Sequence, residues 1–249
     1  WVVYRKAALA YADAMRADLL KLVEAGKVKL DDPLSKYVPN FRGGERIALR
    51  QLLSHTSGVR DYTGMPGYRD VVARDMSTAQ IIDLFRNEDL EFAPGSKWAY
   101  SNSGYVLVGA VIEAASGMPW HVYLARALFE PLGMNHTGYG HDSKHAQQQV
   151  RGYSFHDGAV VPMFAGSMTQ AHAAGALVSN ADDLLRWNRA LHEGRVLGQA
   201  AYAQMITPVG KAADKGIGSG FGLFNDTVRT NAVLLHGGRI FGFMASLSY

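Results

Sequence analysis

The sequence predicts an α/β (α+β) protein in which strands from both chain ends form one antiparallel β-sheet around a largely helical insertion. Trp1–Lys6 is rich in aromatic and β-branched residues, as strands are. Three short strand-like runs with turns between them follow Gly220, which favours antiparallel pairing. Most of the chain between these ends shows helical patterns. A sheet with a helical insertion is the simplest architecture for this order of elements.

Two helices are predicted near the N-terminal end. Ala17–Ala25 carries its apolar side chains on one face, and Gly26 is a natural stop at its C-terminus. A loop punctuated by prolines follows, and a short helix is expected at Leu49–His55. Ala7–Asp13, which precedes the first helix, either continues the N-terminal strand or pairs with it.

Three further helices are predicted in the middle of the chain. Ser77 begins a pattern that resembles a capping box and opens a helix through Phe85. Ser103–Ala115 is apolar on nearly all sides, so this helix is expected to be buried. Pro119 suits the first position of the next helix, which is expected to end near Phe129.

The last third of the chain begins with a segment that is expected to be irregular. This segment, Gly138–Met168, is rich in Gly, His and Gln. Asn180 is predicted to cap a helix at Ala181–His192, with acidic residues in its first turn. The C-terminal strands are expected at Phe221–Asn225, Ala232–His236 and Phe243–Tyr249.

Composition limits the classes of function. The chain has 249 residues, of which 48% are hydrophobic and 19% charged, as in one large domain or two closely packed ones. A net charge of +3 without a basic cluster gives no reason to expect a nucleic-acid partner. The absence of cysteine excludes disulfides, thiolate metal sites and a cysteine nucleophile. No apolar run approaches the ~18 residues of a membrane span. The chain shows no signal peptide, so its compartment stays open, and a periplasmic or secreted parent would carry its signal outside this chain.

The most informative stretch is Phe92–Trp120, in which Tyr100 and Asn102 stand directly before an apolar helix. A phenol and a carboxamide two residues apart at a helix start can be directed at one reacting carbonyl. Each also has a structural interpretation, since a lone Tyr is usually a core residue and an Asn at a helix start is usually a cap. The sequence HGG at 236–238 is equally common as a turn before a strand.

Several motifs at matching separations make the combination more specific than its parts. They are LLSHTSG at 52–58, YSN at 100–102, PLGM at 131–134, GALVSNADDLLRW at 175–187 and HGG at 236–238. With these motifs the chain resembles the serine β-lactamase and penicillin-binding-protein superfamily, in the branch of class C-like β-lactamases and family VIII esterases. The resemblance runs from about Leu22 to Tyr249. It implies an antiparallel sheet flanked by helices (residues 1–30 and 175–249), a mainly helical subdomain (31–174) and an active-site cleft between them.

The resemblance implies acyl transfer and gives roles to residues of this chain. Tyr100 would be the general base or proton shuttle, and Asn102 would orient the substrate. His236 takes the first position of the third motif, where β-lactamases usually carry lysine and the esterase and peptidase branches are closer to histidine. Gly237–Gly238 would let the substrate lie against a strand, and the amide of Arg239 would belong to the oxyanion hole. The substrate would be a small-molecule ester, amide or peptide, with no cofactor.

The nucleophile of the family is missing, because no serine or threonine is followed by lysine three residues later, as S-x-x-K requires. Family spacing puts Leu9 and Ala12 at the serine and lysine positions. A second alignment treats the start of the chain as the family's early strand pair, joined to the distal part of the nucleophile helix between Asp13 and Asp18. On this interpretation the nucleophile segment is lost, and further sheet and a closing helix are missing after Tyr249.

Two interpretations of function therefore stay open. The first is a serine hydrolase that acts on esters, amides or β-lactams through an acyl-enzyme. The second is a catalytically inactive relative, or a truncated fragment, that keeps the substrate cleft without a nucleophile.

Three other patterns invite a chemical interpretation. Ser54–Ser57 resembles a nucleophile–base pair, but short polar side chains that end a helix and fix a loop are the better explanation. His141 and His145 have the spacing of metal ligands on a helix, although their surroundings are polar and loop-like. Gly216–Gly222 is glycine-rich but is not followed by a helical pattern, so it does not predict a dinucleotide site. No metal site is predicted.

Overall fold

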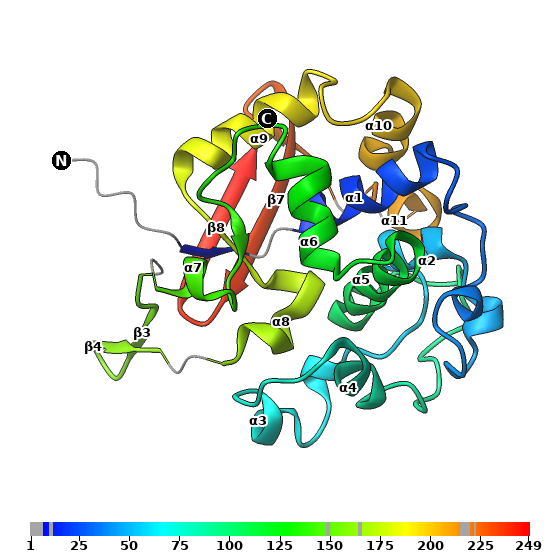
Figure 1. The fold of residues 1–249 in the computed structure, drawn as a ribbon, viewed down its shortest axis with the longest axis horizontal. Helices are drawn as coiled ribbons and strands as arrows, with labels where there is room; N and C mark the ends of the chain where they lie inside the picture. Colours follow the sequence, from blue (N-terminus) through cyan, green and yellow to red (C-terminus); the bar gives the residue numbers. More distant parts are fainter. Residues whose placement is uncertain (1–6, 10–11, 148–149, 164–165, 215–219, 222) are drawn as a thin grey trace.

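The computed structural model describes residues 7–9, 12–147, 150–163, 166–214, 220–221 and 223–249 (Figure 1). The strand predicted at Trp1–Lys6 lies outside these residues.

Helices make up most of the regular secondary structure in the described residues. They are α1 (Ala12–Glu24), α2 (Leu49–Leu53), α3 (Tyr68–Val71), α4 (Thr78–Asp83), α5 (Asn102–Ser116), α6 (Trp120–Leu124), α7 (Ser143–Ala146), α8 (Met168–Gly175), α9 (Ala181–His192), α10 (Gln199–Ile206) and α11 (Gly210–Asp214). Shorter helical turns are η1 (Leu34–Lys36), η2 (Gly44–Arg46), η3 (Tyr62–Gly64) and the π-helical η4 (Ala125–Phe129).

The strands are short and antiparallel. They are β1 (Ala7–Leu9), β2 (Gly138–Tyr139), β3 (Tyr153–His156), β4 (Ala159–Pro162), β5 (Leu177–Ser179), β6 (Phe224–Val228), β7 (Asn231–Ile240) and β8 (Phe243–Ser248). The mixed fold of antiparallel sheet and helices is thus confirmed.

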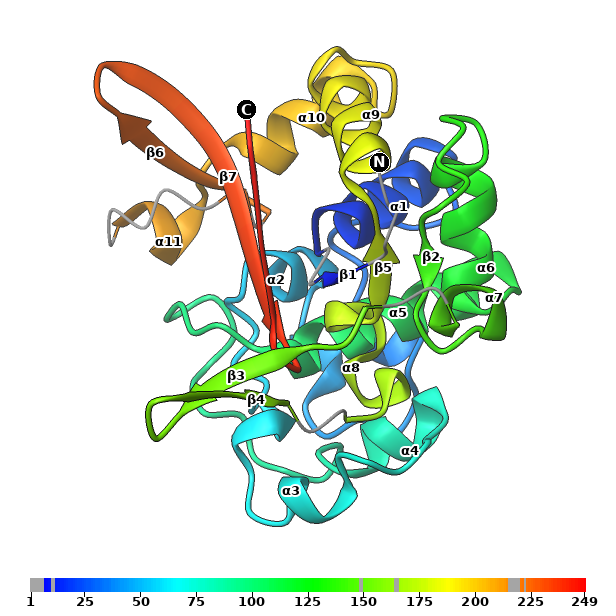
Figure 2. The same cartoon turned by 90° about the vertical axis from the view of Figure 1, so that its left-hand side faces the viewer.

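The described strands are divided among separate sheets rather than joined in one. β1, β5 and β2 form the first sheet, β3 and β4 a hairpin, and β6, β7 and β8 a third sheet. The N-terminal strand β1 lies close to β7 and β8 but pairs with β5, where Ala7 faces Ser179. Figure 2 shows β6 and the adjoining half of β7 extending away from the helices as a two-stranded ribbon. β1 thus pairs with a strand from the last third of the chain, whereas β6, β7 and β8 form a separate sheet among the described residues.

The core is organised around α5, against which α1, α2, α4, α6 and α8 all pack. The Ser101 hydroxyl accepts a hydrogen bond from the Gly104 amide at 3.3 Å and caps the helix, and Gly117 ends it in the left-handed conformation at φ 72°. Gly109 lets α8 approach closely, since a Cβ there would lie 2.8 Å from His172 Cε1. Full burial of each aliphatic side chain of α5 stabilises the fold by about 1.5–3 kcal/mol. The prediction of a buried helix is confirmed.

The first helix begins earlier than predicted. α1 starts at Ala12 instead of Ala17, because the added residues include alanine, methionine and arginine, which favour helices. The predicted junction between Asp13 and Asp18 therefore lies inside an uninterrupted helix. This half of α1 is unusual in burying three charged side chains, those of Asp13, Arg16 and Asp18.

The segment expected to be irregular contains ordered structure. β2 and α7 form within it, and β3 pairs with β4 so that His156 faces Ala159. The two residues of the turn, Asp157 and Gly158, have φ of 48° and 78°, as a tight hairpin turn requires. The other boundaries differ from the predictions by a few residues, and the capping box at Ser77 and the Asn180 cap are confirmed.

No helix in the described part of the chain is long and apolar enough to cross a bilayer.

Candidate active site

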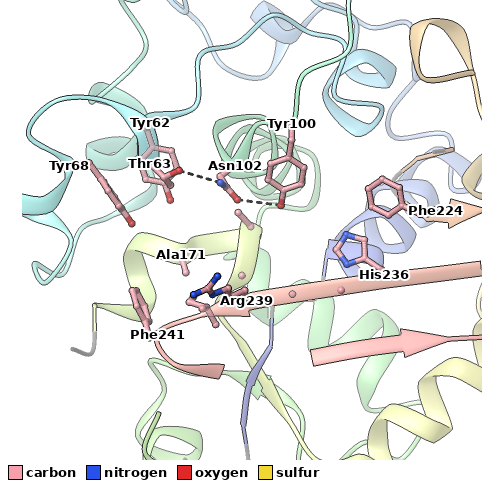
Figure 3. A pocket seen from close by; sticks show the side chains of 15 residues that line it. Tyr62, Thr63, Tyr68, Tyr100, Asn102, Ala171, Phe224, His236, Arg239 and Phe241 are labelled. Atoms are coloured by element: carbon pink, nitrogen blue, oxygen red, sulfur yellow. Dashed lines mark hydrogen bonds between the residues drawn. The ribbon is translucent and has the colours of Figure 1, made fainter. Parts of the chain in front are cut away.

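A cavity of about 430 Å³ lies between the helices and the C-terminal sheet. Its walls come from the segment before α5, from η3 and α3, from α8 and from one stretch of β7 (Figure 3). The lining residues are Tyr62, Thr63, Tyr68, Tyr100, Asn102, Ala171, Ala174, Gly175, Phe224, His236, Gly237, Gly238, Arg239, Ile240 and Phe241. Every catalytic or binding residue predicted from the sequence is therefore brought to one cavity.

Tyr100 and Asn102 reach the cavity from the start of α5. The Tyr100 hydroxyl donates to Asn102 Oδ1 at 3.4 Å, and 42% of the Tyr100 surface is exposed. Desolvation by surrounding protein raises the pKa of the Tyr100 phenol, while the charge of Arg16 opposes this rise. Tyr100 is therefore a neutral hydrogen-bond donor near neutral pH.

The LLSHTSG motif holds this wall in place. His55, buried and in the left-handed conformation at φ 56°, stacks on Tyr100 with ring centroids 4.4 Å apart. Its Nδ1 accepts a hydrogen bond from the Ser101 amide at 3.2 Å. The Ser54 hydroxyl donates to the Arg50 carbonyl, 2.8 Å away, at the end of α2. The motif thus supports Tyr100 structurally, and none of Ser54–Ser57 lines the cavity.

Asp61 joins Asn102 to η3. Its Oδ1 accepts from the backbone amide of Thr63 at 3.0 Å and from the Thr63 hydroxyl at 2.8 Å. Its Oδ2 accepts from Asn102 Nδ2 at 2.9 Å and from the Asn102 backbone amide at 3.3 Å. No local pattern marks Asp61 in the sequence, because its partner Asn102 lies 41 residues further along the chain.

His236 and Arg16 meet at another wall of the cavity. Arg16 Nη2 lies 3.5 Å from His236 Nε2. A guanidinium can only donate, so Nε2 accepts and the neutral ring carries its proton on Nδ1. Burial, together with the Arg16 charge, lowers the pKa of His236 to about 3. His236 is therefore uncharged at neutral pH.

Arg16 is a fully buried cation that the sequence patterns did not single out. Its Nε donates to the Tyr105 hydroxyl, and its guanidinium carbon lies 4.8 Å from the centre of the Tyr105 ring. Among the described residues, Nη1 has no hydrogen-bond partner and no carboxylate lies within 4.0 Å of the guanidinium. Arg16 was missed because it lies in the part of α1 that the sequence predicted to be outside the helix.

One edge of β7 faces the cavity. β6 pairs with β7 only as far as Leu235 in the described part of the chain. Beyond this point, residues 236–240 pair with β8 alone, with Gly237 opposite Ser246 and Arg239 opposite Met244. Gly237, Gly238 and Arg239 all line the cavity. The placement matches the prediction that a ligand lies along this strand, and their roles in binding stay predictions.

The described lining of the cavity contains neither serine nor lysine. The sequence positions that match the nucleophile motif fall at Leu9, the end of β1, and at Ala12, the start of α1. Thr63 supplies an aliphatic hydroxyl to the cavity, but this hydroxyl donates to Asp61.

The remaining candidates lie apart from this cavity. Neither His141 nor His145 lines it. Within the described residues, no group of three or more His, Cys, Asp or Glu side chains is arranged to hold a metal ion. Most of the Gly216–Gly222 segment lies outside the described residues.

The chain was compared with known proteins by sequence and by structure, and both comparisons find relatives of β-lactamases and penicillin-binding proteins. The family described as Beta-lactamase matches residues 17–245. The putative penicillin-binding protein PbpX of Bacillus subtilis (strain 168) is 30% identical over 200 residues, which are 80% of this chain and 49% of that protein. Penicillin-binding protein 4* of the same organism is 28% identical, over 88% of this chain and 52% of its own length. The chain thus spans about half the length of these curated relatives.

Two solved structures share the fold. A D-stereospecific amidohydrolase from Streptomyces sp. superposes with a TM-score of 0.87 at 29% identity, over 98% of this chain and 78% of that one. The D-amino acid amidase from Ochrobactrum anthropi SV3, complexed with L-phenylalanine, gives a TM-score of 0.82 at 27% identity, over 97% and 72%.

The motifs on the cavity wall, the family match along most of the chain and the shared fold lead to one conclusion. The chain belongs to the β-lactamase family, within the β-lactamase and transpeptidase-like superfamily of serine hydrolases.

Proposed function

We propose that this chain binds small amide, ester or peptide ligands in the cavity without forming an acyl-enzyme. One observation carries the proposal: the cavity keeps Tyr100, Asn102 and His236, while its described lining holds no serine and no lysine. Acyl transfer needs a nucleophile within reach of its base. Binding of a ligand requires only the residues that line the cavity, and these residues are present.

The walls suit a ligand with a polar backbone and an apolar side chain. At residues 236–240, the edge of β7 that has no strand partner among the described residues offers backbone donors and acceptors to a carbonyl or an amide, as in strand addition. Aromatic rings from several elements enclose the rest of the cavity, and such rings bury large apolar area. These rings belong to Tyr62, Tyr68, Phe224 and Phe241.

The relatives support an amide or peptide as the ligand class. The names of the aligned proteins include a putative D-alanyl-D-alanine carboxypeptidase and a D-amino acid amidase. The hydrolase activity in those names depends on a nucleophile, whereas the recognition of an amide does not. We therefore expect this chain to share the second property and not the first.

Two measurements on the folded chain test the proposal. Incubation with benzylpenicillin and with a fluorophosphonate should leave the intact mass unchanged. Titration with D-phenylalanine amide should show saturable binding, and Asn102→Ala should weaken it by roughly five- to twentyfold through loss of a buried hydrogen bond. Asp70→Asn, an exposed change on α3, is the matched control and should bind as the unmodified chain does. An adduct mapped to any serine, or a folded sample that does not bind D-phenylalanine amide, would overturn the proposal.

A further inference from the structure

We propose that Asp61 is a positioning residue that turns the carbonyl oxygen of Asn102 toward the cavity, so that the site selects ligands presenting an N–H donor. This inference rests on the proposed function, because it names the ligand chemistry of the same cavity.

The orientation of Asn102 follows from what Asp61 can do. A carboxylate accepts hydrogen bonds and donates none. Asp61 Oδ2 accepts hydrogen bonds from the backbone amide of Asn102 and, at 2.9 Å, from Asn102 Nδ2. The opposite orientation of the carboxamide would set two acceptor oxygens against each other. The Nδ2 group of Asn102 is therefore committed to Asp61, with Thr63 Oγ1 as a second acceptor at 3.4 Å.

The carbonyl oxygen of the Asn102 side chain, Oδ1, is the part of the carboxamide that can accept a hydrogen bond from a ligand in the cavity. In the described part of the chain, the donor to Oδ1 is the Tyr100 hydroxyl at 3.4 Å, a long hydrogen bond. A carbonyl oxygen has two lone pairs, so a ligand N–H can be accepted beside this hydroxyl. Figure 3 shows Asn102 and Tyr100 on the same wall, opposite Arg239. A ligand that offers only a carbonyl there meets another acceptor.

Replacing Asp61 by asparagine tests the mechanism while keeping the fold. Asparagine caps helical turns as well as aspartate does, so η3 should keep its start. To accept from the Thr63 amide, the new carboxamide must direct its oxygen to Thr63 and its N–H₂ to Asn102. Two donor groups then face each other, and Asn102 must rotate to present its own N–H₂ to the cavity. The preference for an N–H ligand should disappear.

The experiment compares two neutral amides that differ in one donor. N-methyl-3-phenylpropanamide has an N–H, and N,N-dimethyl-3-phenylpropanamide has none. Calorimetric titration of the unmodified chain should show the first binding roughly five- to tenfold more tightly, the effect of one net hydrogen bond. In D61N this ratio should fall to about one or below. The double variant D61N/N102D, in which the acceptor at position 102 is restored, should recover it, and the surface control D70N should leave it unchanged.

The outcomes separate this inference from the proposed function. Equal binding of both amides to the unmodified chain, or an unchanged ratio in D61N, would refute the role of Asp61 while leaving a ligand-binding cavity. Failure of both amides to bind the folded chain would refute both proposals. If D61N does not fold, the two amides are compared on N102A instead. An unchanged affinity ratio in N102A, which lacks the Asn102 carboxamide, would exclude the mechanism.

Discussion

The guanidinium of Arg16 acts on several titratable groups of the cavity at once. Burial lowers the pKa of His236 and of His55, and the charge of Arg16 lowers both further; the same charge opposes the rise in the pKa of Tyr100 that burial causes. Arg16 thus supplies a positive charge near Tyr100 from α1, and burial of the phenol still outweighs it.

Removing this charge should be visible in the titration of one ring. In Arg16→Met, the pKa of His236 should rise above about 3 but stay below its ordinary value, because the cation that opposes ring protonation is gone while burial, the larger cause of the lowering, remains. Arg16→Lys should keep it low. Nitrogen-detected NMR of the His236 ring reports both its charge and its tautomer. An identical titration in R16M and in the unmodified chain would contradict the contact between the two side chains.

Single residues also show where sequence reasoning is effective. Tyr100, Asn102 and His236 could be named because each belongs to a short motif at a helix start or on a strand. Asp61 and Arg16 could not, because their roles come from partners that the fold alone brings near.

Among the elements, α1 contains a buried carboxyl group that lowers the stability of the fold at neutral pH. The Asp18 carboxylate is fully buried, and both of its oxygens lack a hydrogen-bond partner among the described residues. Burial raises the pKa of Asp18 well above its ordinary value, with Lys21 opposing the rise. The folded chain thus binds this proton more tightly than the unfolded chain does. Stability is therefore lost as pH rises from about 4 through the raised pKa.

Relieving this burial should stabilise the protein. Asp18→Leu should raise the free energy of unfolding at pH 7 by about 1–3 kcal/mol, since an unpaired polar group is replaced by an apolar one. Urea denaturation followed by circular dichroism measures the change. The exposed Asp70→Asn should have an effect within about 0.5 kcal/mol. A destabilised D18L would show that the carboxylate has a partner in solution.

The β3–β4 hairpin shows why an element can be missed. Its turn, Asp157-Gly158, is a strong local hairpin signal. The surrounding composition of Gly, His and Gln concealed it, because these residues suggest a loop. α5 was predicted with its length and burial nearly correct, since capping, apolar content and a terminal glycine all agree at that place.

For the whole molecule, buried and partly buried histidines contribute to the response to acid. Burial lowers the pKa of His172 and His236 to about 3 and that of His192 to about 4. Below pH 6.5 the unfolded chain binds protons at these rings while the folded chain does not. The contribution of these rings to stability should therefore fall as pH drops from about 6.5 to 4, by at most about 3 kcal/mol for His172 alone, while protonation of the buried Asp18 acts in the opposite direction.

Thermal melting between pH 7 and pH 4 tests this response. Relative to the unmodified chain, His172→Gln should lose less melting temperature, or gain more, between pH 7 and pH 4. The exposed His156→Gln should leave the slope unchanged. An equal slope in His172→Gln and in the unmodified chain would mean that the His172 ring is protonated in the folded state.

The fold class and the gathering of the site were predictable for the whole chain, but the division into sheets was not. Pairing of β1 with β5 joins residues about 170 positions apart, and periodicity within a segment carries no information about such a partner.

The positions that match the nucleophile motif lie at the end of β1 and the start of α1, about 90 residues before the proposed ligand wall at the start of α5. This separation has a consequence for engineering, because the two segments can be changed one at a time. The first turn of α1 is itself part of the core, with Ala14 and Met15 fully buried, so a redesign there must keep these side chains in place. Such a chain would offer a way to install a reaction in a pocket whose selectivity has been measured beforehand.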